Sequence, residues 1–202
     1  MIATQDKQKL TQSTLRVGSL LPILAILDEF GSDSEEVLGA AGINPSLIDD
    51  PDMLIPYAAR GTLIARSVEA TGCQHFGLLI GQRMDLHSLG LPGLLARSLP
   101  KVKAALHTLQ KHFAAHTTGA ALDLEIEGDI ATLTYAFLEP NVEATDQLGG
   151  GAIAAVFNVM NSLCGPGFQA LEASFAHRKP ADIRPFREFF QIPLYFNAPR
   201  YS

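Results

Sequence analysis

The chain has 202 residues, of which 47% are hydrophobic and 18% charged, and its formal net charge is −6. This length predicts about one domain, or one domain with an extra lobe, and the apolar fraction excludes general disorder. The acidic balance argues against a free-standing nucleic-acid binder, which needs basic surface to displace counterions from phosphates. Cys73 and Cys164 form no CxxC pair, so we expect reduced thiols, with one long-range disulfide as the alternative.

The beginning of the chain resembles a secretory signal peptide, because basic residues precede an apolar run at 17–27. That run is too short to span a bilayer, and Asp28 and Glu29 follow it in place of a small-residue cleavage site. We therefore predict a flexible tail over residues 1–16, an amphipathic helix from residue 17, and a cytoplasmic protein without a membrane partner.

Helical signals dominate the chain from residue 17 to about residue 116. Apolar residues recur there at three- and four-residue spacing, and glycines such as Gly72 follow the expected helix ends. A short extended piece is expected at 53–55. The predicted helical segments are 17–30, 34–41, 57–70, 76–83, 93–99 and 100–116.

After Gly119 the apolar period changes from about 3.6 residues to about 2. Residues 122–127 and 132–137 alternate apolar and polar side chains around a Gly128–Asp129 turn, which predicts a hairpin with one buried face. The sequence therefore predicts an α+β fold. It comprises an N-terminal helical part and a β-β-α-β-α-β unit, whose antiparallel or mixed sheet is covered by helices. The later elements are expected at 143–163 (helix), 171–177 (strand), 186–190 (helix) and 194–196 (strand).

Two short patterns suggest chemistry, and each also has a structural explanation. Gly149–Gly151 lacks the Lys-Ser/Thr of a phosphate loop and falls within a helical stripe, which favours close helix packing. His112 and His116 have a metal-binding spacing without the HExxH pattern, so packed histidines are the alternative. Because no nucleophile elbow or catalytic Cys–His signature is found, we predict no enzyme, no cofactor and no metal.

The segment 177–190 is the most distinctive part of the chain. His177 is expected on the same strand face as Leu171, Ala173 and Phe175, which points its side chain toward the interior. A buried imidazole needs a hydrogen-bond partner, and that partner is either a structural acceptor or a ligand.

A set of short motifs is spread over most of the chain: Phe76–Gly81, Gly90–Gly93, the helix Leu99–Phe113, Phe175–Arg178, Pro180, Asp182, Phe189–Phe190 and Phe196–Ala198. By the order and spacing of these motifs, the chain resembles the N-terminal effector domain of AraC-type transcription regulators, in the branch called the arabinose-binding domain, from about residue 19 to 199. The resemblance implies a bacterial regulator whose domain at 17–199 senses a small molecule and often forms a homodimer. It also implies a C-terminal domain with two helix-turn-helix motifs that binds promoter DNA. This chain ends where the linker to that domain is expected, so we expect the DNA-binding domain to be absent from it.

We expect an effector pocket between the apolar face of the sheet and the helices that begin near Pro100 and Glu143. Four polar residues are expected to converge on it, with a filled core of mutually satisfied polar atoms as the alternative. Two other functions stay open: a stand-alone small-molecule or cofactor-binding sensor, and a plain dimerisation module without DNA binding. Either of the two covering helices is a candidate dimer interface. The four pocket residues are Tyr135, His177, His116 and Asn158.

Overall fold

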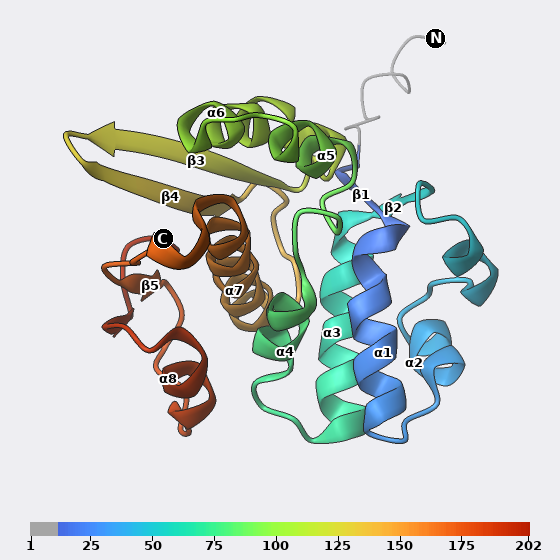
Figure 1. The fold of residues 1–202 in the computed structure, drawn as a ribbon. Coiled ribbons are helices and arrows are strands. Elements are labelled where there is room, and N and C mark those ends of the chain that lie inside the picture. The colour runs from blue at the N-terminus through green and yellow to red at the C-terminus, as the bar shows by residue number, and fades with distance from the viewer. Residues whose placement is uncertain (1–11) are drawn as a thin grey trace, which may run out of the picture.

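The computed structural model describes residues 12–202, so the expected tail at residues 1–11 lies outside the described part. Figure 1 shows helices grouped around α7, with the long β3–β4 hairpin projecting to one side. The first part contains β1 (Thr14–Arg16), η1 (Val17–Leu20), α1 (Leu21–Glu29), α2 (Ser34–Ala40), η2 (Pro45–Asp49), β2 (Leu54–Pro56), α3 (Tyr57–Thr71), α4 (Phe76–Arg83), α5 (Leu91–Arg97), α6 (Val102–His112) and η3 (Phe113–Ala115), the η elements being 3-10 helices. The second part contains β3 (Ala120–Glu127), β4 (Ile130–Phe137), α7 (Thr145–Cys164), η4 (Gly165–Gly167), β5 (Ala173–Phe175), α8 (Arg184–Phe190) and β6 (Leu194–Phe196). This order confirms the predicted α+β class.

The prediction of a flexible tail is wrong for Thr14–Arg16, which form β1. This strand pairs antiparallel with β2, and Leu15 lies opposite Ile55. Leu15 is fully buried. A residue that looks isolated in a polar segment is thus held by a partner strand far along the chain, which no local period reveals.

The strands form three two-stranded sheets, of which β3–β4 is antiparallel and β5–β6 parallel. Tyr201 and Ser202 lie between the last two sheets. The Tyr135 N–H donates to the Tyr201 carbonyl at 3.0 Å, and Ser174 and Ser202 exchange two backbone hydrogen bonds. The antiparallel or mixed sheet expected from the sequence is therefore present as two strand pairs joined through residues 201–202. Leu171 precedes β5 and is 65% exposed, so its predicted place on the buried strand face is wrong.

Close contact between α4 and α7 fixes the centre of the fold. A Cβ on Gly81 would overlap the carbonyl oxygen of Gly151 and lie 2.6 Å from the Cβ of Ala154. A Cβ on Gly151 would lie 2.6 Å from the carbonyl oxygen of Gly77. These glycines let two helix backbones approach closely, so packing explains the triple-glycine segment better than a phosphate cradle does.

The helix α7 belongs to a stretch, Thr145–Gly167, that is long and apolar enough to cross a membrane, with a mean hydropathy of 1.3 in its most apolar window. A core helix has the same property. Here α7 packs against α4, β4 and β5 inside the fold (Figure 1).

The apolar face of the hairpin is covered by α6 and α7, as the sequence predicts. Leu124 and Tyr135 are buried there, and Leu122 and Leu133 are partly buried. Ile126, nearer the tip, is 39% exposed, because the hairpin extends past the covering helices.

Candidate functional site

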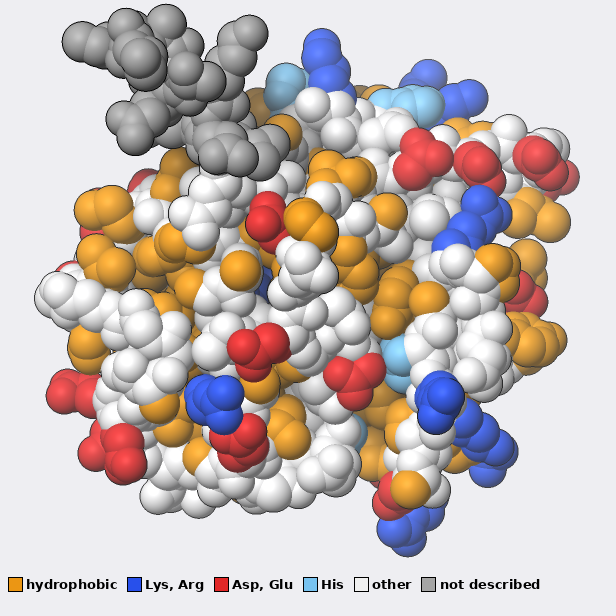
Figure 2. Space-filling view, turned by 180° about the vertical axis from the view of Figure 1, so that it is seen from behind, with side chains coloured by type: hydrophobic (Ala, Val, Ile, Leu, Met, Phe, Trp, Pro, Cys, Tyr) orange, Lys and Arg blue, Asp and Glu red, His pale blue; other side chains and the backbone are white. Residues whose placement is uncertain are grey.

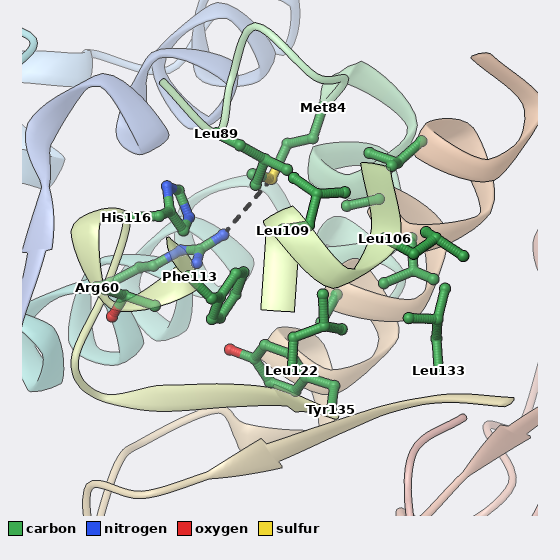
Figure 3. Close-up of a pocket in the computed structure, with 15 residues that line it drawn as sticks. Arg60, Met84, Leu89, Leu106, Leu109, Phe113, His116, Leu122, Leu133 and Tyr135 are labelled. Carbon is green, nitrogen blue, oxygen red and sulfur yellow. Dashed lines mark hydrogen bonds between the residues drawn. The ribbon is translucent and has the colours of Figure 1, made fainter. Parts of the chain in front are cut away.

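A cavity of about 60 Å³ lies between α3, α6, α7 and the β3–β4 hairpin. Figure 3 shows its side chains, with Arg60 and His116 at one end and Leu106 and Leu133 at the other. The space exceeds what one water molecule needs and is smaller than a cavity of about 150 Å³ that admits benzene. Most of the wall is apolar: Met84, Leu89, Leu106, Leu109, Phe113, Leu122, Leu133, Ala152, Ala155, Val156 and Val159.

Among the lining residues there is no lysine, aspartate or glutamate, and Arg60 is the only arginine. Its side chain is buried, with 8% of the residue exposed. The spacing of Tyr57, Arg60 and Ile64 along α3 turns all three toward the core. Its Nη2 donates to the Met84 sulfur at 3.8 Å, while its Nε has no partner among the described residues. None of the ion pairs within residues 12–202 includes Arg60. Arg60 is therefore a buried charge without a counter-charge in the described part of the chain.

His116 lies beside Arg60 and is 3% exposed. Burial, together with the positive charges of Arg60 and Arg16, lowers the pKa of its imidazole to about 3. The ring is thus neutral near pH 7, with one N–H donor and one acceptor nitrogen. Its Nδ1 has no hydrogen-bond partner among residues 12–202.

Tyr135 adds a hydroxyl to the same end of the cavity. Its Oη lies 2.8 Å from the Oη of Tyr57. Burial raises the pKa of both phenols, that of Tyr135 well above its ordinary value, so both stay protonated. Because one hydrogen joins the two oxygens, the second hydroxyl hydrogen of the pair is available to another acceptor.

His177 lies away from this cavity, in a second hollow of about 250 Å³ bounded by α4, α7 and the segment before α8. The Tyr201 hydroxyl donates to the Thr145 carbonyl at 3.2 Å and lies 3.3 Å from the His177 Nδ1. Burial lowers the pKa of His177, while the charge of Asp146 opposes this shift. Figure 2 shows histidine in a groove beside the lobe that carries α8, whose surface bears basic side chains.

Asn158 makes structural contacts. Its Nδ2 lies 3.1, 2.9 and 3.2 Å from the carbonyl oxygens of Gly81, Gln82 and Met84. It therefore ties α7 to the carboxyl end of α4 and lines neither hollow.

The structure thus brings together Tyr135 and His116 among the four expected site residues, and it separates them from His177 and Asn158. Sequence reasoning missed Arg60. The available signal was a charged residue between Tyr57 and Ile64, within the apolar stripe of a predicted helix.

The metal-binding interpretation of His112 and His116 loses its basis. The helix α6 ends at His112, and His116 follows the 3-10 helix Phe113–Ala115, so the two do not share one helical face. Within residues 12–202, no group of three or more His, Cys, Asp or Glu side chains is placed to hold a metal ion.

Sequence similarity identifies the family to which this fold belongs. Residues 31–202 match the family described as "Arabinose-binding domain of AraC transcription regulator, N-term", so the chain belongs to this family and the predicted resemblance is confirmed.

The ornithine utilization regulator of Pseudomonas aeruginosa is 23% identical to the chain over 177 residues, which cover 88% of the chain and 52% of that regulator. The crystal structure of the transcriptional regulator CdpR from Pseudomonas aeruginosa shares the fold. Its TM-score is 0.55 at 17% identity, and the match covers 81% of this chain and 50% of the CdpR chain. The chain therefore spans about half the length of each of these regulators.

Proposed function

We propose that this chain is the effector-sensing part of an AraC-type transcription regulator that controls promoter activity in response to a small molecule. One observation carries the proposal: a largely apolar cavity with buried, unpartnered polar atoms on Arg60 and His116 lies inside a domain of this family. Such a combination is typical of small-molecule sites. The polar atoms serve recognition in this proposal, and no catalytic step is assigned to them.

In this proposal, promoter DNA is bound by a helix-turn-helix domain outside these residues, in a cytoplasmic protein. The net charge of −6 supports a role other than DNA contact for this part. The alternative is a stand-alone sensor or dimerisation module without DNA binding.

We also propose a homodimer, because paired promoter half-sites call for two DNA-binding domains. The two helices expected as interfaces are poorly suited to it. Most residues of α7 are buried or half-buried, and the exposed side chains of α6 include Lys103, His107 and Lys111. Sedimentation of the chain at tens of micromolar tests the dimer, and a strictly monomeric profile contradicts it.

The proposed function is tested in the full-length regulator with a promoter reporter. Removal of residues 12–202 should leave promoter binding by the remaining part and abolish the response to every compound that changes reporter output in the wild type. The 202-residue chain alone should not retard the promoter fragment. Sequence-selective retardation by the chain alone, or an unchanged response after the deletion, contradicts the proposal.

A further inference from the structure

We infer that the cavity binds the carboxylate group of a small organic acid with an apolar body and no amino group, and that Arg60 is the cationic partner of this carboxylate. The inference rests on the proposed function, because it names the ligand class of the same site.

The first support is the state of Arg60. A guanidinium keeps its charge in proteins and presents N–H donors in a planar fork that matches a carboxylate. In this structure the Arg60 fork donates to the Met84 thioether, a weak acceptor, and its Nε has no partner among residues 12–202. A charge removed from water is unfavourable unless an opposite charge pairs with it. A ligand carboxylate supplies that charge and accepts these hydrogen bonds.

The second support is the chemistry of the neighbouring polar groups. The neutral His116 ring carries one N–H, and the Tyr57–Tyr135 pair has one hydroxyl hydrogen to spare. Arg60, His116 and the Tyr135 hydroxyl lie together at one end of the cavity (Figure 3). A set dominated by donors favours an oxyanion.

The third support is that the residues of the wall provide no counter-charge for an ammonium group. None of the lining residues carries a carboxylate. The Thr117 hydroxyl already donates to the Thr14 carbonyl at 2.9 Å and accepts from the Gly119 N–H at 3.1 Å. An amine or an α-amino acid would therefore place a second cation beside Arg60 without a counter-charge.

The walls and the volume define the rest of the ligand. Leucine side chains, among them Leu106 and Leu133, line the end of the space away from Arg60 (Figure 3), so the body of the acid is apolar. At about 60 Å³ the space suits a short chain, and a longer chain requires the wall to move. Met84 and Leu89, which lie between α4 and α5, form the part of the wall that we expect to move, because methionine adapts readily to a new neighbour.

The test is a series of ligands added to the 202-residue chain, with binding measured by thermal unfolding and by isothermal titration calorimetry. The probes are the straight-chain carboxylates from propionate to octanoate, each beside the primary alcohol, the amine and the α-amino acid of equal carbon number. We expect at least one carboxylate to raise the melting temperature in a saturable way. Its three analogues and inorganic phosphate should each bind at least about tenfold more weakly than that carboxylate.

Variants in α3 then test the role of Arg60. We expect Arg60→Met to lose about tenfold or more in carboxylate affinity, because a charge-assisted hydrogen bond is removed. Arg60→Lys should recover part of the loss. Arg66→Met is the matched control: Arg66 lies on the same helix, is more exposed and pairs with Glu69, so its removal should leave the affinity unchanged. The melting temperature of Arg60→Met without ligand, expected to be no lower than that of the wild type, shows that it folds.

Several outcomes overturn the inference: no carboxylate binds, alcohols or amino acids bind as tightly as carboxylates, or a folded Arg60→Met binds like the wild type. These outcomes leave the proposed function standing if the promoter reporter still responds to a compound of another class. Loss of the reporter response in the regulator lacking residues 12–202, as proposed above, is independent of the ligand class.

Discussion

The buried His116 makes the stability of the domain depend on pH. Its pKa is about 3 in the folded chain against an ordinary value of 6.5. Because the folded value is the lower one, the unfolded chain binds the proton more readily below pH 6.5, and stability falls as the pH falls. A pH of 5 lies about 1.5 pH units below the pKa of the unfolded chain, and this interval corresponds to a loss of about 2 kcal/mol in the free energy of unfolding.

Urea unfolding at pH 7.5, 6 and 5 measures this loss directly. The His116→Gln variant should lack it, while His107→Gln should keep it, because His107 is exposed on α6 and lines neither hollow. The pH dependence of the unfolding free energy is compared, so a constant destabilisation of either variant does not affect the result. If wild type and His116→Gln lose the same stability between pH 7.5 and 5, then His116 is not buried beside Arg60 and Arg16 as described.

Four substitutions test the packing and the site by urea unfolding. Gly81→Ala should cost about 1–3 kcal/mol, because its Cβ meets Gly151 and Ala154. By contrast, Gly39→Ala should gain about 0.5–1 kcal/mol, since nothing lies within 4 Å of its Cβ; equal effects of the two would contradict the close α4–α7 contact. Asn158→Ala should cost about 1–3 kcal/mol, because the carbonyls of Gly81, Gln82 and Met84 lose the Asn158 donor, and a neutral result would remove its bridging role. Arg60→Met should stabilise the ligand-free chain by about 1 kcal/mol or more, whereas a loss would mean that Arg60 has a partner.

Much of the fold was accessible from the sequence because its elements have clear periods. The alternation over 122–137 placed Tyr135 on the buried face of a hairpin, and the structure pairs Leu122 with Tyr135. Helical stripes gave α3, α6 and α7 to within a few residues. The pairing of β1 with β2 and the bridge through Tyr201 were inaccessible, because they join segments far apart in the chain.

The candidate site was accessible only in part, for a physical reason. Tyr135 and His116 lie where strand and helix periods point inward, and both line the first cavity. His177 and Asn158 also point inward, yet their polar atoms contact Tyr201 and the end of α4. The isolation of Arg60 is a tertiary property, because a sequence does not show which carboxylates come within reach of a guanidinium.

The most direct test of the ligand site follows the methyl groups of the cavity wall by NMR. The chain, labelled with ¹³C at leucine and valine methyls, is titrated with the carboxylate that binds best in the series above. The account predicts saturable shifts at Leu106, Leu122 and Leu133 and none at Leu94, which is exposed on α5. Shifts confined to surface methyls such as that of Leu94, or no shift at the cavity wall at saturation, would contradict it.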